Sequence, residues 1–199
     1  MGTAIRECSC IVGENAIHVE GLFLYRNECG STAVKLFLED FLETKISFDD
    51  IYGAYLAEID LPDRQVFFSD NSGMRRFFIH WEDARFEKTF IAALSKGERN
   101  PNYAAIAQFL YFGCVYNSET IEKHVIQSSA GSYYEVRGGK IEEKSKMLAP
   151  LKALDADEEI LGKMMRTVCK AIPAYGECFC TITGGWTAGL SLRIFYTTG

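Results

Sequence analysis

The hydrophobic and polar residues in the first part of the chain follow the pattern of strands flanking a single helix. Residues 16–25, with the sequence AIHVEGLFLY, are rich in β-branched and aromatic side chains and predict a strand. Ser31 begins a predicted amphipathic helix. The apolar residues that fall largely on one side of this helix are Val34, Leu36, Phe37, Phe41 and Leu42. Residues 51–60 and 65–70 predict a hairpin, because the turn-forming sequence Leu-Pro-Asp-Arg joins them.

Short strands are also predicted downstream of this hairpin. Residues 77–81, with the sequence FFIHW, indicate a third strand of the same meander, and residues 85–90 indicate a fourth. Residues 132–137 predict another strand, which a Gly-Gly turn connects to residues 140–144. We therefore expect antiparallel strands to dominate this part of the chain.

Residues 103–112 predict a second helix. Asn100 or Asn102 can cap its N-terminus, because a side-chain oxygen there accepts hydrogen bonds from free backbone N–H groups. Pro101 suits the first turn, and Gly113 ends the helix. The side chains that we expect to point inward are Ile106, Phe109 and Leu110.

The composition changes near residue 145, and the last fifty residues read as a new unit. Pro150 lies in a predicted linker over residues 145–156. We therefore divide the chain into a domain over residues 1–148 and a short α/β fragment over residues 149–199.

The predicted fragment consists of a helix, a strand and a glycine turn. Asp155 or Asp157 caps the helix, which runs to about Lys170. Its apolar residues at helical spacing are Ile160, Leu161, Met164, Met165, Val168 and Ile172. Residues 178–183 then predict a buried strand that enters a Gly-Gly turn, as at the start of a parallel α/β layer.

The composition narrows the classes of partner. The chain has 199 residues and a net charge of −6 without a dense Lys/Arg cluster, which disfavours nucleic acids and anionic membranes as partners. No stretch approaches the roughly 18 apolar residues of a membrane span. The seven cysteines are scattered, which suits a reducing cytoplasm better than a disulfide-linked exterior.

Three stretches, in order, resemble the asparagine synthetase family of glutamine-dependent amide-forming enzymes. Residues 52–78 are similar to that family's hairpin, G-x-F-A-F-x-x-x-D followed by A-R-D-x-x-G-x-R-P-L-Y. The matching positions are Gly53, Asp60, Asp70, Gly73, Arg75 and Phe78. Residues 103–145 resemble the family's YLxFGYV helix and LPPGHYLxV strand. The sequence TITGGWTAG resembles the S-G-G-x-D-S-[ST] loop that binds the pyrophosphate of ATP in the synthetase domain.

The resemblance implies an α+β fold of the N-terminal-nucleophile hydrolase type. In this fold two antiparallel sheets form an αββα sandwich, and here a short α/β fragment would follow it. The turn that contains Asp70, Gly73 and Arg75 would then support the core of the sandwich. We expect a structural ion pair at this turn, with an anion site as the alternative.

The residues that glutamine hydrolysis requires are not where the family has them, so we expect no catalytic residue in this chain. The family's nucleophile is a Cys directly after the initiator Met, activated by its own α-amine. Here Gly2 follows Met1, and the thiols of Cys8 and Cys10 have only peptide nitrogens beside them. The His-Arg-Gly-Pro segment that grips glutamine is missing, and Gly30-Ser-Thr-Ala33 replaces the family's S-D-T-E.

The glycine loop has three interpretations. Backbone N–H groups at such a turn can hold phosphate, so the candidates for phosphate binding are Thr183, Gly184, Gly185 and Thr187. A degenerate loop without useful ATP affinity is the leading interpretation, because Thr187, Ala188 and Gly189 replace the acid and hydroxyl residues. A functional variant that binds ATP with Mg²⁺ and an unrelated turn are the alternatives.

The remaining candidates favour structural roles. Cys8-x-Cys10 and Cys178-x-Cys180 suggest a zinc site, but both pairs lie in apolar sequence where cysteine is a small core residue, and we expect no metal. The histidines are expected to pack or to lie on the surface; they are His18, His80 and His124.

The leading functional hypothesis is an asparagine-synthetase-like protein with an inactive glutaminase-like domain, related to ATP-dependent amide formation. The alternative is a peptide- or protein-binding module on the same fold.

Overall fold

The computed structural model of the chain describes residues 7–94 and 99–148, together with Gly162 and Arg166. The helices are α1 (Gly30–Leu42), α2 (Phe90–Ala93) and α3 (Tyr103–Phe112), with a 3₁₀ turn at Phe48–Asp50. The first strands are β1 (Glu7–Val12), β2 (Asn15–Tyr25), β3 (Glu28–Cys29), β4 (Ile51–Asp60) and β5 (Gln65–Ser69). The later strands are β6 (Phe78–His80), β7 (Arg85–Glu87), β8 (Val125–Gln127), β9 (Ser132–Arg137) and β10 (Lys140–Ser145).

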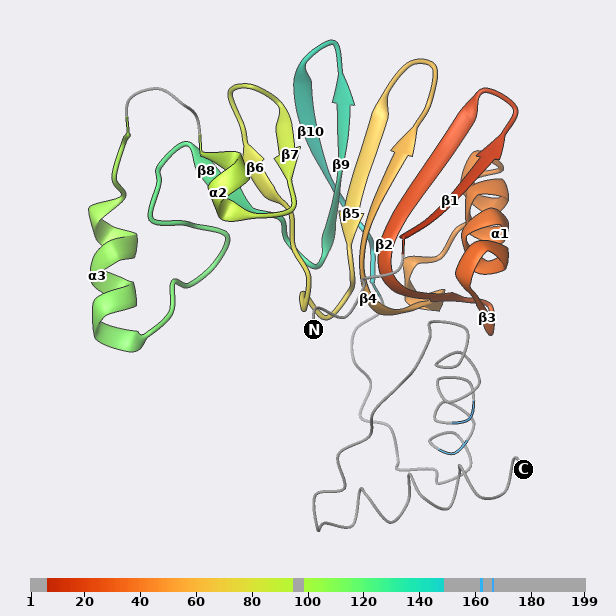
Figure 1. The fold of residues 1–199 in the computed structure, drawn as a ribbon, viewed down its shortest axis with the longest axis horizontal. Helices are drawn as coiled ribbons and strands as arrows, with labels where there is room; N and C mark the ends of the chain where they lie inside the picture. The colour runs from red at the N-terminus through yellow and green to blue at the C-terminus, as the bar shows by residue number, and fades with distance from the viewer. Residues whose placement is uncertain (1–6, 95–98, 149–161, 163–165, 167–199) are drawn as a thin grey trace.

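The strands form two sheets (Figure 1). The large sheet has the order β1-β2-β4-β5-β9-β10, with β3 paired to β2, and the small sheet has the order β7-β6-β8. Every pairing among the described residues is antiparallel. The fold is therefore α+β with antiparallel sheets, as the sequence predicted at this level.

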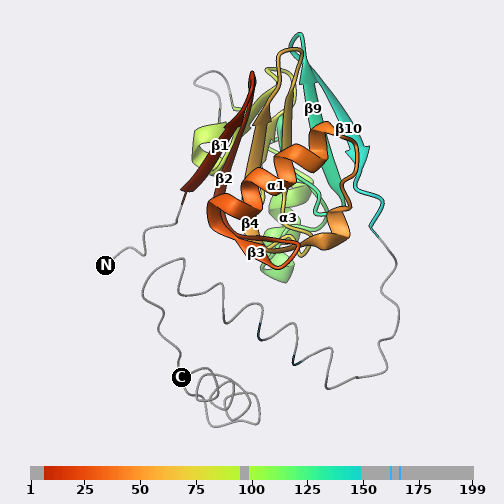
Figure 2. The same ribbon diagram turned by 90° about the vertical axis from the view of Figure 1, so that its right-hand side faces the viewer.

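Helix α1 covers one face of the large sheet (Figure 2) and contacts β1, β2 and β3. Phe37 of α1 is fully buried at the centre of this layer. Its ring meets Phe23 and Tyr25 edge-on at centroid distances of 5.6 and 5.3 Å, and it lies 5.4 Å from Phe68. Such aromatic pairs add to the hydrophobic stabilisation of the core.

The small sheet packs on the opposite face of the large sheet through a second aromatic cluster. Phe67 of β5 and Phe86 of β7 stack with centroids 4.1 Å apart, and Phe77 meets both rings edge-on. The buried residues of this cluster are Leu56, Phe67, Phe77, Ile79 and Tyr134. The layers therefore run in the order α1, large sheet, small sheet.

The structure confirms both long helices within a residue or two. It also confirms the strands predicted at 16–25, 51–60, 65–70, 132–137 and 140–144. The prediction that residues 77–81 and 85–90 extend the first meander is wrong, because β6 and β7 belong to the small sheet. Alternation shows that a strand has one apolar face, but it does not show which sheet the strand joins. Strand β1 was not predicted.

The fragment over residues 149–199 is described only at Gly162 and Arg166, both helical and within the predicted helix. The predicted strand at 178–183 and the glycine loop lie outside the described residues.

Lys146, directly after β10, forms hydrogen bonds with residues at the end of β5. Its side chain is buried, and its Nζ donates to the Ser69 carbonyl at 2.5 Å and to Asn71 Oδ1 at 3.1 Å. The ammonium also lies 5.6 Å from the centre of the Phe48 ring. Burial lowers the pKa of Lys146 to about 8, although the charge of Asp70 opposes this shift.

We predict that replacing Gly53 by Ala destabilises the fold severely. Gly53 has φ +122°, and a Cβ there would lie 2.1 Å from the backbone oxygen of Leu22 on the neighbouring strand. The free energy of unfolding in urea should fall by about 3 kcal/mol or more. Gly13→Ala is the control: its φ is +64° with open space around it, so the loss should be about 1 kcal/mol. Equal losses in the two variants would contradict the proposed clash.

We also predict that stability rises between pH 7 and 9.5. The folded state holds the Lys146 proton less tightly than the unfolded chain does, so the unfolded state binds more protons between about pH 8 and 10.5. This linkage should raise the free energy of unfolding by about 2 kcal/mol over that interval, measured by urea denaturation. Lys146→Met should remove the rise. Above pH 10 the opposite trend should set in, because burial raises the pKa values of Tyr25 and Tyr134 to about 12.

Candidate functional site

Helix α3 begins and ends as its sequence predicts. Asn102 is the N-cap, and its side-chain oxygen accepts a hydrogen bond from the Ala105 N–H at 3.2 Å. Gly113 ends the helix in the left-handed conformation, with φ 75°. Local sequence therefore accounts for both ends of α3.

The orientation predicted for α3 is wrong. Ala105 is its only buried residue, whereas Phe109 is 53% exposed and Leu110 is 80% exposed. The helix is apolar on every side, with Gln108 as its only polar side chain apart from the tyrosine hydroxyls. A 3.6-residue period cannot select an inward face in such a helix.

Backbone hydrogen bonds just before α3 hold the helix in place. Asn102 donates its N–H to the Ile121 carbonyl, and Lys123 donates to the Asn100 carbonyl, both at 2.9 Å. The Asn100 N–H meets the carboxylate of Glu122 at 2.9 and 3.1 Å. These contacts fix the helix without burying its side chains.

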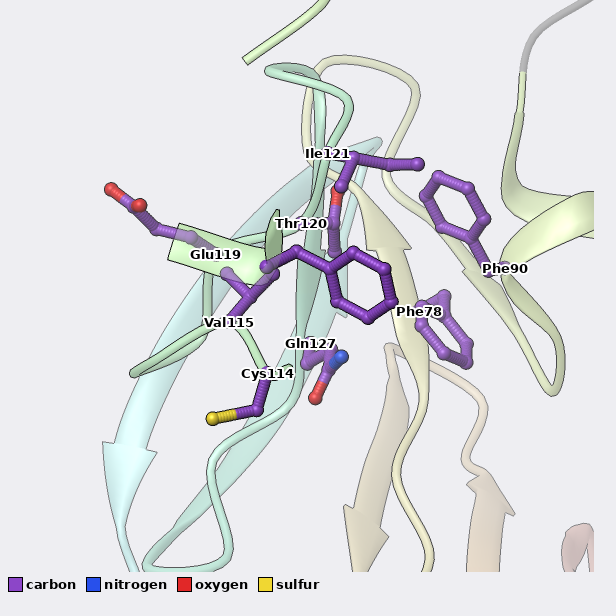
Figure 3. A pocket seen from close by; sticks show the side chains of 9 residues that line it. Phe78, Phe90, Cys114, Val115, Glu119, Thr120, Ile121 and Gln127 are labelled. Carbon is purple, nitrogen blue, oxygen red and sulfur yellow. The ribbon is translucent and has the colours of Figure 1, made fainter. Parts of the chain in front are cut away.

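A pocket of about 420 Å³ lies between α3, α2 and the small sheet (Figure 3). The residues that line it are Phe78, Phe90, Phe109, Cys114, Val115, Glu119, Thr120, Ile121 and Gln127. Phe78 and Phe90 meet edge-on at 5.8 Å. Figure 3 shows the carboxylate of Glu119 pointing away from these rings. The wall formed by the rings is therefore apolar.

The hydroxyl of Thr120 already has hydrogen-bond partners within the protein. Its Oγ1 lies 2.8 Å from the Glu122 carbonyl and 2.6 Å from the Val125 carbonyl, and it accepts the Glu122 N–H at 3.1 Å. The hydroxyl is thus occupied within its own loop. A pocket with this lining is suited to bind an apolar group rather than to carry out acid–base chemistry.

The apolar lining continues onto an exposed surface, here called the α3 surface. Its exposed side chains are Tyr103, Phe109, Leu110, Tyr111, Phe112 and Tyr116. The rings of Tyr111 and Phe112 lie 4.8 Å apart, and those of Phe112 and Tyr116 lie 5.5 Å apart. Tyrosine and phenylalanine are enriched where proteins bind one another. The one sequence feature that indicates this role is the absence of charged residues from positions 103–116.

The turn with Asp70, Gly73 and Arg75 lies away from this pocket, after β5. The buried Asp70 carboxylate accepts backbone N–H groups from Ser72, Met74 and Arg75 at 3.1, 3.0 and 2.7 Å. Gly73 adopts φ +68° within the turn. The guanidinium of Arg75 pairs with Glu20 at 2.5 Å instead of with the Asp70 carboxylate suggested by the sequence.

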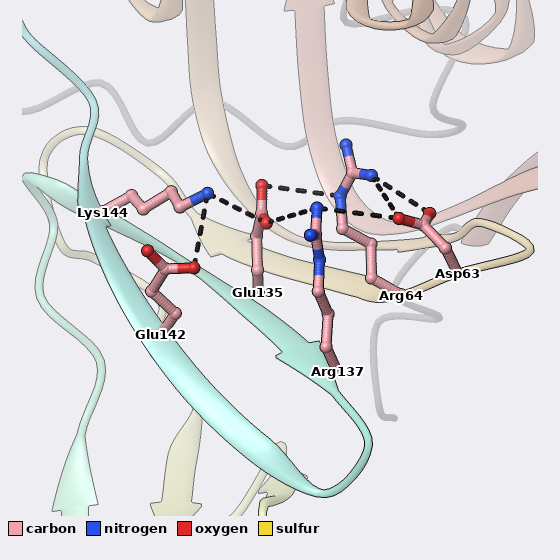
Figure 4. A network of polar contacts seen from close by, with 6 residues as sticks. All are labelled: Asp63, Arg64, Glu135, Arg137, Glu142 and Lys144. Carbon is pink, nitrogen blue, oxygen red and sulfur yellow. Dashed lines mark hydrogen bonds and ion pairs between the residues drawn. The ribbon is translucent and has the colours of Figure 1, made fainter.

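A second charged cluster surrounds the buried Glu135 (Figure 4). Its carboxylate lies 3.5 Å from Arg64 Nε, 3.4 Å from Arg137 and 3.0 Å from Lys144. The cations also meet Asp63 and Glu142. Because these cations already face carboxylates, we assign the cluster a structural role at the tips of the β4–β5 and β9–β10 hairpins.

Each of the three histidines has a polar partner in the structure. His18 Nδ1 lies 2.7 Å from Ser9 Oγ, which the register of β1 and β2 places opposite it. Glu58 faces His18 on the other side, and its pKa is raised by burial and by Asp60. On this strand face Ser9 is exposed, and His18 and Glu58 are half-buried.

The other two histidines lie together at one end of the small sheet, where β6 ends and β8 begins. The rings of His80 and His124 stack at 6.1 Å. His80 Nδ1 lies 3.2 Å from Asp83, and His124 Nδ1 lies 3.1 Å from Glu82. Both acidic partners lie in the turn between β6 and β7. Asp83 follows His80 by only three residues, whereas Glu82 is distant from His124 in the sequence.

The cysteines of β1 face the core beneath α1. Cys8 and Cys10 lie on the same side of the strand and pack against the large core. The second cysteine pair, Cys178 and Cys180, lies outside the described residues. The same holds for the phosphate-loop candidates Thr183, Gly184, Gly185 and Thr187. Within residues 7–94 and 99–148, no three His, Cys, Asp or Glu side chains gather as metal ligands.

Comparison with protein-family models and with curated proteins gave no match to this chain. In the described part of the chain, no helix has the length and apolar character needed to cross a bilayer.

Proposed function

We propose that this protein carries a glutaminase-like domain, related to that of the asparagine synthetases, that does not hydrolyse glutamine and instead binds a peptide or protein. The observation that carries the proposal is the α3 surface with its adjoining apolar pocket. Apolar hollows that adjoin exposed aromatic side chains are typical of binding sites.

The layered arrangement supports the relationship to N-terminal-nucleophile hydrolases. The two antiparallel sheets stack face to face, α1 covers the large sheet, and α2 contacts β6 and β7 of the small sheet. This order is compatible with an αββα sandwich. Gly53 and Asp70, which carry the sequence resemblance, both lie where the backbone constrains the choice of residue.

The surroundings of the N-terminal thiols support the loss of hydrolysis. Cys8 and Cys10 lie within a strand, so each nitrogen is part of a peptide bond and cannot act as the base. Their side chains pack against the core. Ala33, in the segment that replaces the family's substrate-binding acid, is fully buried in α1.

For the synthetase-like fragment we propose a degenerate loop at Thr183–Thr187 that contributes no ATP-dependent amide formation by itself. We also propose a cytoplasmic location, since Cys10, Cys29 and Cys114 are free thiols.

We predict that the purified full chain releases no glutamate from glutamine. The physical reason is that neither described thiol near the N-terminus has a free amine beside it. An enzyme-coupled glutamate assay measures this. Turnover that disappears in Cys8→Ala or Cys10→Ala would show that the chain is a glutaminase and would overturn the proposal.

We predict that a random peptide library, selected on the immobilised full chain, yields peptides with aromatic or leucine anchors. Ile121→Arg should abolish the enrichment, because it places a charge in the pocket wall. Ile11→Arg is the matched control, since Ile11 is also exposed but lies on β1. Enrichment that survives Ile121→Arg would exclude the pocket as the binding site.

A further inference from the structure

The outer side of α3 forms an apolar stripe. Tyr103, Ala107 and Leu110 recur at positions i, i+4 and i+7, which lie on one side of a helix. All three are exposed, as is Tyr111 one residue further along. In Figure 1 the helix projects at the end of the molecule away from α1. A second helix can therefore approach it without meeting the large sheet.

The outer stripe of α3 is large enough for a weak protein interface. At exposures of 74, 80 and 84%, the side chains of Tyr103, Leu110 and Tyr111 leave on the order of 500 Å² open, taking roughly 150–250 Å² for each large side chain. The largest apolar patch on a typical monomer covers about 300–600 Å² and is often functional. Two such stripes would bury about 1,000 Å² in total, which is the size of a weak or transient interface.

The charge of this surface favours a second copy of the same chain. Residues 103–116 contain no Asp, Glu, Lys or Arg, although the chain carries a net charge of −6. Two copies that meet through this surface bring no like charges into contact, and neither surface demands a charged complement. Apolar helix faces are also complementary to themselves, as a two-fold interface requires.

We propose that α3 packs antiparallel against α3 of a second copy, around a two-fold axis near Ala107. The small side chain of Ala107 permits close approach of the two helices. Tyr103 and Tyr111 each lie four residues from Ala107, which is about 6 Å along the helix. In an antiparallel pair, Tyr103 of one copy therefore meets Tyr111 of the other. This inference rests on the proposed function, because it names the partner of the same surface.

The first test is sedimentation velocity of the full chain between about 1 and 100 µM. A dimer with a dissociation constant on the order of 10 µM is expected. The dimer should persist in 1 M NaCl, because salt screens the repulsion between two negative copies. Leu110→Glu should weaken dimerisation roughly a hundredfold, since it places two carboxylates in the interface. Ile11→Glu, at a residue 75% exposed against 80% for Leu110, should leave dimerisation unchanged.

The second test places a thiol at the proposed axis. In a Cys114→Ser background, Ala107→Cys should form an intermolecular disulfide under mild oxidation, because the two copies of residue 107 face one another. Ile11→Cys in the same background should give no more cross-linked dimer than the background itself. Circular dichroism of each variant checks that the fold is kept.

A chain that stays monomeric at 100 µM overturns the inference, and so does a dimer that Leu110→Glu does not weaken. Peptide selection that succeeds on a monomeric chain leaves the proposed function standing while the second copy is excluded. Co-sedimentation of the chain with phosphatidylcholine vesicles that Leu110→Glu abolishes would assign the surface to a membrane and would also overturn the inference.

Discussion

The arrangement of the large and small sheets depends on the carboxylate of Asp70. This side chain is fully buried at the point where the chain leaves the large sheet to form the small one. It accepts three backbone N–H groups within the next five residues, together with the Ser72 hydroxyl. Hydrogen bonds to a charged acceptor contribute about 1.5–3 kcal/mol each, so this turn is specified far more strongly than an ordinary loop. A neutral side chain of similar size could not satisfy all these donors.

The Asp70 turn also directs Arg75 towards the large sheet. Arg75 and Lys88, which lie before β6 and after β7, both pair with the buried Glu20 of β2. Burial alone would raise the pKa of Glu20, but the two cations outweigh it and lower the pKa. The carboxylate therefore stabilises the fold above its unfolded pKa, and this contribution is lost as the pH falls through the lowered value. One buried anion thus joins the ends of the small sheet to the middle of the large one.

Strands with one buried face could be predicted from sequence, because burial imposes a period of two residues. This holds best for β2, whose alternating Ile17, Val19, Phe23 and Tyr25 belong to the core beneath α1. Strand β5, by contrast, is buried on both faces. The assignment of β6 and β7 to a second sheet could not be predicted, since it follows from the Asp70 turn and from pairing with β8, nearly fifty residues later. The pocket was missed for the same reason. Its walls come from β6, α2, α3 and β8, and only their long-range packing brings these together.

Helix α3 shows how a segment can be ordered without being buried. In most helices of soluble proteins an apolar stripe faces the core and a charged face meets water, and the buried stripe provides the stability. Here the pairing of residues 100–102 with residues 121–123 positions the helix, so its side chains need not pack inward. Solubility would favour charged side chains on the outer face of such a helix, yet α3 contains no charged residue. Around the cysteines of β1, by contrast, the space is filled by core packing. The exposed apolar surface of the domain therefore lies at α3, whereas the thiols of β1 pack against the core at the other end of the molecule (Figure 1).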